Sequence, residues 1–437
     1  MEWWVILSVG LTLLLGMFLT GLPIFISFLI INIIGVFILF GQSGFPILTN
    51  SMFDTANTAS LATIPLFILL GELLFRSGTI DALLNTVDVL VGRVRGRQYF
   101  VSIALSTLFG ALSGAAMGVA AMLGRSLFPS MIKRGYDVKL SIGTMLAGAS
   151  LAPIIPPSIL AIIIGTLADV SIAKLLMAGI LPGLLLSGLF VIYVLLRIHF
   201  NPSLAPPPLD DESKTKPNWN DKLRAITQSL PFIVIIFSIM GVIFLGIATP
   251  SEAAATGVFG ALLTAAIYKK LSWKLTWEAT GSAAAVGAMV LAIMASSKMF
   301  SQILAFTGAT KSLTLAITSL PVSDMSMLLV MLLLPFILCM FIDQIALMLV
   351  IIPIYEPVIA SLGFDPVWFW TLFLINITVG GITPPFGYTM FAFIGAAEGV
   401  SIKDVFAASW PFVGLFILGT AILIKYPSII TYLSSLL

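Results

Sequence analysis

Long runs of apolar residues, separated by short polar stretches, follow one another along almost the whole chain. A run of about 20 residues is long enough to cross the roughly 30 Å hydrocarbon core of a bilayer as a helix. In the first half the runs fall at about 3–19, 22–40, 62–75, 99–129, 140–168 and 172–198. In the second half they fall at about 230–245, 253–268, 279–304, 325–353, 367–397 and 405–424. The pattern predicts an all-α polytopic membrane protein.

One soluble-looking stretch divides the chain at about 199–224. It contains Pro206-Pro207-Pro208, Asp210-Asp211-Glu212 and basic residues, which is typical of a solvated linker. We therefore place a first unit at 1–198, a cytoplasmic linker at 199–224 and a second unit at 225–437. Two further segments, 81–91 and 306–320, alternate apolar and polar residues at helical spacing, and we expect them to lie in the membrane interface.

Composition excludes several classes of function. Hydrophobic residues make up 59% of the chain and charged residues 9%, whereas a soluble domain carries about 25% charged residues. With one histidine (His199) and one cysteine (Cys339), the chain offers no disulfide framework, no Cys/His metal site and no Ser–His or Cys–His catalytic pair. It contains no Gly-Lys dipeptide and hence no phosphate-binding loop of the Walker A type. We expect neither an enzyme nor a nucleic-acid-binding protein.

The two halves resemble each other at fixed landmarks. Pro129, Gly135, Asp137, Pro156 and Pro157 recur 228 positions later, as Pro357, Gly363, Asp365, Pro384 and Pro385. Pro23 matches Pro250 at an offset of 227, and Val170-Ser171-Ile172 matches Val400-Ser401-Ile402 at 230. An internal duplication of this kind is typical of secondary transporters.

Charges orient the first repeat. Arg93, Arg95 and Arg97 precede the 99–129 run, and Lys133 and Arg134 follow it, so the positive-inside rule places both of its ends on the cytoplasmic side. Each limb would be about 14 residues, or roughly 21 Å of helix, which is too short to cross. We predict a re-entrant helical hairpin at about 98–134, followed by a broken transmembrane helix at about 139–168.

The second repeat should be inverted. Its hairpin, at about 324–356, is flanked by Asp324, Glu356 and Asp365 without nearby Lys or Arg, so it should enter from the outer face. A second broken helix follows at about 365–397. Five full crossings per half give the inversion and place both termini outside, and most of the 21 Lys and Arg residues then fall inside.

The candidate site lies where the helical pattern breaks at membrane depth, because such backbone is tolerated only in protein or beside a cavity. The hairpins should turn at Gly110–Gly114 and at Phe341–Gln344, and the broken helices at Ala152–Ser158 and Gly380–Pro385. Proline removes amide donors and leaves carbonyls free, and carbonyl and hydroxyl oxygens suit sodium. With few ionisable groups in the spans, a sodium-driven mechanism is favoured over a proton relay.

Each candidate also has a purely structural explanation. The proline pairs could kink helices for packing alone. Asp343, the one acid near the middle of an apolar run, could cap the second limb of its hairpin instead of binding an ion. Arg125 could neutralise a substrate carboxylate or extend towards the basic cytoplasmic rim.

These motifs carry a resemblance to a known family. Ile-Ile-Pro-Pro-Ser at 154–158 and Gly-Ile-Thr-Pro-Pro-Phe-Gly at 381–387 accompany Lys-Arg-Gly-Tyr-Asp at 133–137 and Phe-Ile-Asp-Gln-Ile-Ala at 341–346. Together they resemble the large membrane subunit, of DctM type, of tripartite ATP-independent periplasmic (TRAP) transporters, over essentially the whole chain.

The resemblance implies a scaffold and a mobile transport domain that carries both hairpins and moves as an elevator. It implies sodium-coupled import of an organic acid, such as sialic acid or a C4-dicarboxylate, across the bacterial inner membrane. It also implies two partners, a DctP-type periplasmic binding protein and a small four-helix DctQ-type membrane subunit. Sodium is the expected coupling ion, with no other metal or cofactor.

Carried over position by position, the resemblance assigns site residues. The sodium site of half one would comprise Ser113, Gly114, Pro153, Pro156 and Ser158. The sodium site of half two would comprise Asp343, Gln344, Gly380, Gly381, Thr383 and Pro384. The substrate candidates are Ser113, Arg125, Pro157, Thr383 and Pro385. Relatives often continue the first tip with further serines, whereas Ala115 and Ala116 stand here, so backbone carbonyls would carry more of that ion site or the substrate would differ.

Three alternatives remain open. A stand-alone sodium/anion symporter of the same superfamily would need no binding protein. A membrane-embedded enzyme would need several ionisable side chains at membrane depth, where only Asp343 is available. A passive channel fits less well, since paired half-sites facing opposite sides suit alternating access.

Overall fold

The computed structural model describes residues 2–77, 79–91, 94–113, 116–207 and 218–437. Within these ranges the chain forms α-helices and short 3₁₀ turns and contains no strand. Eight helical segments of the described chain are long and apolar enough to cross a membrane. They are 24–56, 59–76, 172–200, 219–244, 250–267, 273–306, 344–362 and 402–425. The chain is therefore a multi-pass membrane protein, as the apolar runs predict.

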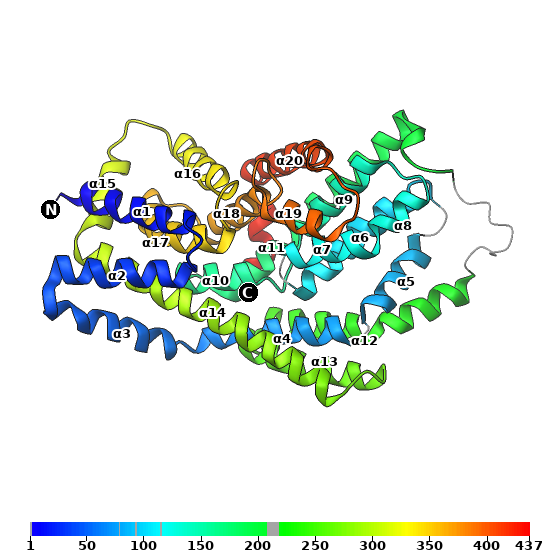
Figure 1. The fold of residues 1–437 in the computed structure, drawn as a ribbon, viewed down its shortest axis with the longest axis horizontal. Helices are drawn as coiled ribbons and strands as arrows, with labels where there is room; N and C mark the ends of the chain where they lie inside the picture. Colours follow the sequence, from blue (N-terminus) through cyan, green and yellow to red (C-terminus); the bar gives the residue numbers. More distant parts are fainter. Residues whose placement is uncertain (1, 78, 92–93, 114–115, 208–217) are drawn as a thin grey trace.

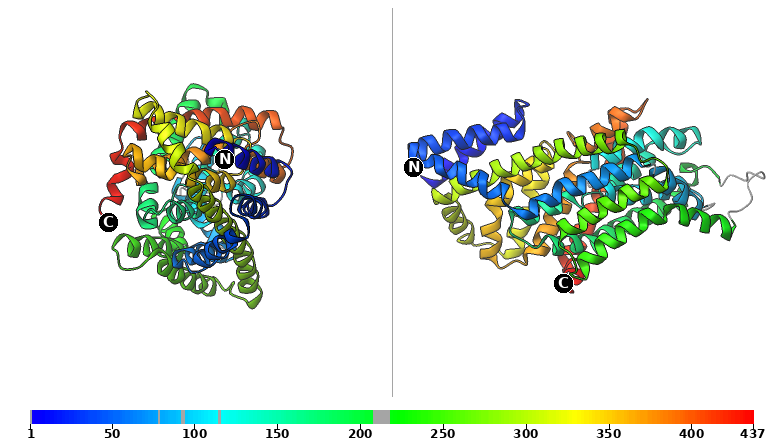
Figure 2. Two further views of the ribbon diagram at one scale, coloured as in Figure 1. Left: turned by 90° about the vertical axis from the view of Figure 1, so that its left-hand side faces the viewer. Right: turned by 90° about the horizontal axis from the view of Figure 1, so that it is seen from below.

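One group of helices, which we call the scaffold group, lies in the lower part of Figure 1. Its members are α2 (Ile24–Phe40), α3 (Phe45–Ala56), α4 (Thr63–Arg76), α12 (Trp219–Phe244), α13 (Pro250–Ile267) and α14 (Trp273–Phe306). The longest helix, α14, packs against α2, α3 and α4, and the right-hand view of Figure 2 shows these helices side by side along the molecule. The helix α1 (Trp3–Leu19) packs on α2.

An ion-pair network fixes the crossing of α4 and α14. Arg76 Nε lies 2.9 Å from the carboxylate of Glu72, four residues earlier on the same helix. Arg76 Nη1 lies 2.7 Å from Glu278 of α14. The arginine therefore links two scaffold helices from distant parts of the sequence.

A second group, the hairpin group, contains both hairpins and both broken helices (Figure 1). In the first repeat it comprises α6 (Arg97–Ser113), α7 (Ala116–Ser126), α8 (Phe128–Lys133), α9 (Val138–Ala149), α10 (Ile159–Leu167) and α11 (Ile172–Phe200). In the second it comprises α16 (Asp324–Cys339), α17 (Gln344–Leu362), α18 (Pro366–Gly380), α19 (Tyr388–Ala396), α20 (Ile402–Lys425) and α21 (Ser428–Ser434). The amphipathic helices α5 (Thr79–Val91) and α15 (Ala309–Thr318) bridge the groups: α5 contacts α12 and α6, and α15 contacts α14 and α17.

The repeat is visible in where helices begin. The broken helix of each half starts 228 positions apart, at Val138 for α9 and at Pro366 for α18. The second hairpin limb of half two, α17, starts at Gln344, which is 228 positions after Ala116, the first described residue of α7. By the same offset α3 corresponds to the start of α14, since Phe45 matches Trp273.

The sequence landmarks are turn and cap residues. Asp137 and Asp365 each accept a hydrogen bond of 2.8 Å from a backbone amide of the first turn that follows, of Leu140 and of Trp368. Gly135 and Gly363 have positive φ angles of 82° and 70°, which other residues adopt only with strain. These positions kept their residue types because the backbone turns there require them.

The structure corrects several boundaries. The helix α6 continues to Ser113, so Gly110–Ser113, expected in the first turn, are helical. The helix α17 continues beyond Pro353 to Leu362, whereas the apolar run ended at Pro353. The reason is that the Ser297 hydroxyl of α14 donates a 2.6 Å hydrogen bond to the Leu349 carbonyl, which Pro353 leaves without its usual intrahelical donor.

Other helices were longer than expected or not expected at all. The helix α12 begins at Trp219, inside the segment expected as linker, where Asp221, Lys222 and Arg224 lie in its first turns. The helix α3 was not expected, because its mixed sequence is only moderately apolar.

Candidate functional site

The second hairpin tip and the second helix break lie against each other. The tip comprises Met340–Asp343, between α16 and α17, and the break comprises Gly381–Gly387, between α18 and α19. Gly380, at the end of α18, packs directly on the end of α16. A Cβ at Gly380 would lie 3.0 Å from the backbone carbonyl carbon of Cys339, so only glycine allows this approach.

Asp343 caps the second limb of its hairpin. Its Oδ1 accepts hydrogen bonds from the amides of Ile345 at 2.9 Å and Ala346 at 3.4 Å, which is the N-cap arrangement of α17. The side chain is partly exposed, and Oδ2 has no hydrogen-bond partner within the described chain. The structural role that the sequence left open is therefore present, and one carboxylate oxygen is still available to a ligand.

A side-chain contact joins this tip to the break. The Tyr388 hydroxyl, at the first turn of α19, donates to the side-chain carbonyl of Gln344. Gln344 is buried at the first turn of α17. The Tyr388 ring also lies over Gly381, where a Cβ would overlap it. Sequence reasoning assigned Gln344 and Gly381 but missed Tyr388, whose position directly after the Pro-Pro-Phe-Gly motif was the available signal.

The second break leaves backbone oxygens without helical hydrogen-bond partners. The amides of Ile382 and Thr383 bond back to the carbonyls of Val379 and Gly380, at 3.0 and 3.1 Å, and so close the last turn of α18. The carbonyls of Ile382, Thr383 and Pro384 accept no backbone hydrogen bond within the described residues. Pro384 and Pro385 are joined by a cis peptide bond.

Thr383 is fully buried, and its hydroxyl donates a 2.8 Å hydrogen bond to the Val379 carbonyl. The donated proton leaves the oxygen lone pairs of Thr383 free to accept or to coordinate. The break therefore offers this hydroxyl oxygen and three carbonyls, and the adjoining tip offers one oxygen of Asp343. All of these residues except Ile382 were predicted for the site.

The first break is similar in backbone but differs in side chains. The carbonyls of Ile154, Ile155 and Pro156 accept no backbone hydrogen bond within the described chain, and Pro156-Pro157 is also cis. Ile155 stands where half two has Thr383, so half one has no hydroxyl there. Gly179 of α11 packs against the Ile154 carbonyl so closely that a Cβ would overlap it.

Ser158 caps α10. Its hydroxyl oxygen accepts from the Ala161 amide at 3.1 Å, and the hydroxyl donates to the Pro153 carbonyl. Both oxygens were assigned to the first sodium site, and in this structure they bond to each other across the break. The oxygens of this break that accept no hydrogen bond within the described chain therefore include the carbonyls of Ile155 and Pro156.

The first tip is only partly described. The backbone of Ser113 ends α6, but its side chain, together with Gly114 and Ala115, lies outside the described residues. The hairpin limb α6 and the broken helix α9 pack tightly where they are described. A Cβ at Gly148 of α9 would come 2.6 Å from the Cβ of Ser106 on α6.

Arg125 is not brought to the tip. It lies in the last turn of α7, nine residues after Ala116, or about 14 Å along the helix. Its side chain is exposed. Arg125 therefore lies at the end of α7 away from the first tip, which is the end that the positive-inside rule assigns to the cytoplasmic side.

Comparisons with known proteins place this geometry in context. Residues 11–429 match the model of the family described as tripartite ATP-independent periplasmic transporter, DctM component. The chain is 30% identical to the ectoine TRAP transporter large permease protein TeaC of Halomonas elongata, with 97% of each chain covered. It is 27% identical to the C4-dicarboxylate TRAP transporter large permease protein DctM of Pseudomonas aeruginosa, with 90% of each covered.

Solved structures agree in fold. The YdaH transporter of Alcanivorax borkumensis matches with a TM-score of 0.64 and 16% identity, over 90% of this chain and 91% of that one. MtrF of Neisseria gonorrhoeae, described as one of a class of antimetabolite efflux pumps, matches with a TM-score of 0.58 and 15% identity, over 88% and 84%. The relatives in sequence are transporter subunits and not enzymes.

Proposed function

The chain belongs to the DctM component family of tripartite ATP-independent periplasmic transporters, and we propose that it uses a sodium gradient to import a small organic acid. As a TRAP large permease it is a multi-pass protein of the inner membrane and carries out secondary transport. Beyond family membership, we propose the sodium coupling, the elevator movement and the class of solute.

The observation that carries the proposal is the set of available oxygens in half two. These are the carbonyls of Ile382, Thr383 and Pro384 at the break, the Thr383 hydroxyl, and one oxygen of Asp343 at the adjoining tip, and all but Ile382 belong to residues assigned to one site. Hard oxygen ligands in irregular backbone at membrane depth are the arrangement by which broken helices hold coupling cations. Tyr388, through Gln344, would hold the two parts of the site together.

The first half would supply a second, weaker ion site. Its carbonyls at Ile155 and Pro156 are free, but the Ser158 hydroxyl and the Pro153 carbonyl already bond to each other. We therefore expect sodium affinity to depend more strongly on residues of half two. The solute would bind between the two tips.

An elevator movement fits the division into two groups. The hairpin group holds both breaks, whereas the scaffold group offers the long helices α4 and α14 as a wall. In the proposed cycle the hairpin group moves along this wall, and contacts such as the Ser297–Leu349 bond between α14 and α17 break and re-form.

We propose two partners on the basis of the family, a small DctQ-type membrane subunit and a DctP-type periplasmic binding protein. Relatives are named for ectoine and for C4-dicarboxylates, so we take ectoine and succinate as the first solutes to test. The alternative is a stand-alone sodium/anion symporter, which would work without the binding protein.

The test is uptake of labelled ectoine and succinate into proteoliposomes that contain the chain and its small partner, with and without the binding protein. Uptake that needs both the binding protein and an inward sodium gradient supports the proposal. Asp343→Ala and Thr383→Ala should abolish the sodium dependence, whereas Asp365→Ala, which removes a comparable cap away from the tips, should retain it. Uptake without the binding protein would favour the symporter, and uptake indifferent to sodium would refute the coupling.

A further inference from the structure

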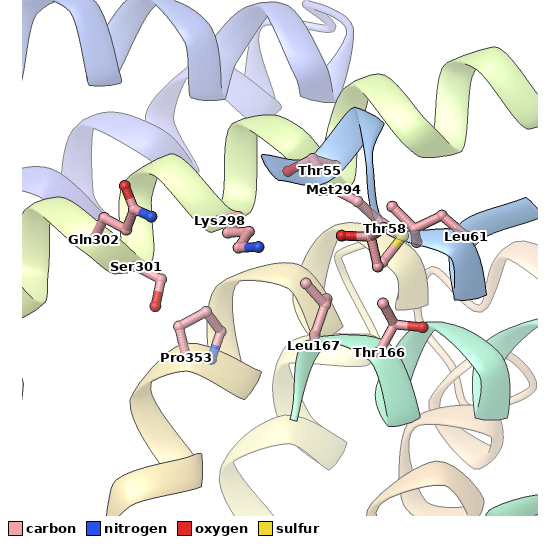
Figure 3. Close-up of a pocket in the computed structure, with 10 residues that line it drawn as sticks. All are labelled: Thr55, Thr58, Leu61, Thr166, Leu167, Met294, Lys298, Ser301, Gln302 and Pro353. Carbon is pink, nitrogen blue, oxygen red and sulfur yellow. The ribbon is translucent and has the colours of Figure 1, made fainter. Parts of the chain in front are cut away.

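The scaffold and hairpin groups enclose a cavity that none of the assigned tip or break residues lines (Figure 3). Its volume is about 240 Å³, many times the roughly 30 Å³ that one water occupies in the liquid. The scaffold walls are the end of α3, the turn before α4, and α14; the hairpin walls are the end of α10 and Pro353 of α17.

The position of the cavity connects it to the tips. Pro353 lies ten residues beyond Asp343, about 15 Å along α17. The charge pattern assigns the far end of α17 to the outer side of the membrane. The cavity therefore lies between the second tip and the outer face, at the surface where the two groups meet.

The cavity contains the ammonium group of Lys298, near the middle of the lining residues in Figure 3. Lys298 is partly buried and forms no ion pair with any residue in the described ranges. Asp54, Asp169 and Glu356 are the acids next to the lining segments, and none is within ion-pair distance of it. A lone cation in a membrane helix is unfavourable and marks a functional position.

Three hydrogen-bond donors share one face of α14. Lys298, Ser301 and Gln302 are three and four residues apart and so point to the same side. The side-chain carbonyl of Gln302 already accepts a bond from Ser51 of α3, which leaves its amide group to donate.

The other lining segments offer acceptors. The hydroxyls of Thr55, Thr58 and Thr166 donate to carbonyls of their own helices or turns, at 2.7, 2.8 and 2.8 Å. Each threonine oxygen can then only accept a bond from a ligand. Donors therefore line the cavity on α14, and acceptors line it on α3, on the turn before α4 and on α10.

We propose that this cavity binds the solute between the outer face and the tips, and that Lys298 recognises its carboxylate. The solute class is a small carboxylate with a hydrogen-bond donor at its other end, which the threonine oxygens would accept. This rests on the proposed function, because it assumes that an organic acid passes between the two groups.

The first test measures the cavity itself, without transport. Ser301→Cys is introduced in a Cys339→Ala background, which keeps the Cβ that packs on Gly380. The rates of modification by an anionic sulfonatoethyl and a cationic trimethylammonium-ethyl methanethiosulfonate reagent are compared. We expect the anionic reagent to react faster, and Lys298→Met to lower the ratio of the two rates about tenfold. Ectoine should protect the cysteine, and Lys298→Met should remove the protection.

The second test measures transport. Lys298→Met should raise the KM for ectoine uptake roughly tenfold or more, as expected for a lost hydrogen bond to a charged group, and Lys298→Arg should restore most of it. The matched control is Lys311→Met, which removes an exposed lysine of α15 that does not line the cavity.

The outcomes separate the two proposals. Modification that is indifferent to reagent charge and unprotected by ectoine overturns the cavity proposal, even if sodium-driven uptake is intact. Charge-selective, protectable modification in a protein whose uptake ignores sodium supports the cavity and refutes the coupling. The cavity proposal is also overturned if Lys298→Met leaves the KM for ectoine uptake unchanged while size-exclusion chromatography shows unchanged folding.

Discussion

Gly380 packs so closely on Cys339 that a single added methyl group can test whether the second tip and the second break form one ion site. In Gly380→Ala the new Cβ would lie 2.3 Å from the Cys339 Cβ, 3.0 Å from its carbonyl carbon and 3.2 Å from its Cα. The best separation for such carbon atoms is about 3.5–4.0 Å, so α16 and α18 must separate by about 1.2–1.7 Å. The backbone fixes the positions of all three Cys339 atoms, so none of them can move aside by changing a rotamer.

The expected effects on stability and on ion binding differ in size. Overpacking costs about 1–3 kcal/mol, and the helix gains about 0.5–1 kcal/mol when alanine replaces glycine, so unfolding free energy should fall by at most about 2.5 kcal/mol. Displacing residues that position ion ligands typically lowers metal affinity about 10–100-fold. At a sodium concentration 100 times the wild-type Kd, the stabilisation by sodium should then fall from about 2.7 kcal/mol to about 0.4 kcal/mol for a 100-fold loss.

The assay is thermal unfolding of the purified chain in sodium chloride and in choline chloride, followed by the sodium dependence of uptake in proteoliposomes. Gly414→Ala is the matched control, because a Cβ at Gly414 of α20 meets nothing within 4 Å. It should leave the sodium effect unchanged. If Gly380→Ala keeps the full sodium stabilisation, the tip and break do not form one ion site.

Three further predictions concern the same region. Asp343→Asn should keep the cap of α17 and its stability but lose sodium-dependent uptake, whereas Asp343→Ala should lose both, with a stability change of about 1 kcal/mol. Tyr388→Phe removes the bond to Gln344 and should lower stability by about 1 kcal/mol and raise the sodium concentration needed for half-maximal uptake. Ser297→Ala leaves a buried carbonyl of α17 without a donor and should lower unfolding free energy by about 1–3 kcal/mol. Adding Pro353→Ala restores an amide to that carbonyl and should recover most of the loss, as a double-mutant cycle by chemical denaturation would measure.

Each of these has a result that contradicts it. Sodium-dependent uptake retained in Asp343→Asn would leave Asp343 with the capping role alone. An unchanged sodium response in Tyr388→Phe would mean that Gln344 is held by packing instead. Additive effects of the Ser297 and Pro353 substitutions would show that the serine does not compensate for the proline.

Much of the fold followed from residues that only one backbone geometry accepts. The capping aspartates and the positive-φ glycines recur at one offset because a helix start or turn constrains the residue type directly. The end of α17 could not be predicted, because the donor that lets it pass Pro353 is Ser297, far away in sequence. Local pattern carries no information about such tertiary compensation.

The candidate site also combines local features, which the sequence reveals, with tertiary contacts, which it does not. The proline breaks are local features, and the sequence located them. The contact of Tyr388 with Gln344 and the mutual bonding of Ser158 and Pro153 depend on how the chain folds back on itself. The Lys298 cavity was invisible for the same reason, since its walls come from four separate segments.

The two matching scaffold helices differ in continuity. The helix α14 runs unbroken from Trp273 to Phe306, whereas its counterpart in the first repeat is interrupted between α3 and α4 at 57–62. Bending of a helix concentrates where its hydrogen-bond ladder is broken. The interrupted helix of the first repeat should therefore bend more easily than α14. A bilayer thinner or thicker than the native one would therefore be accommodated at 57–62, which adjoins the Lys298 cavity. We expect the transport rate to vary with lipid chain length mainly through this one interruption.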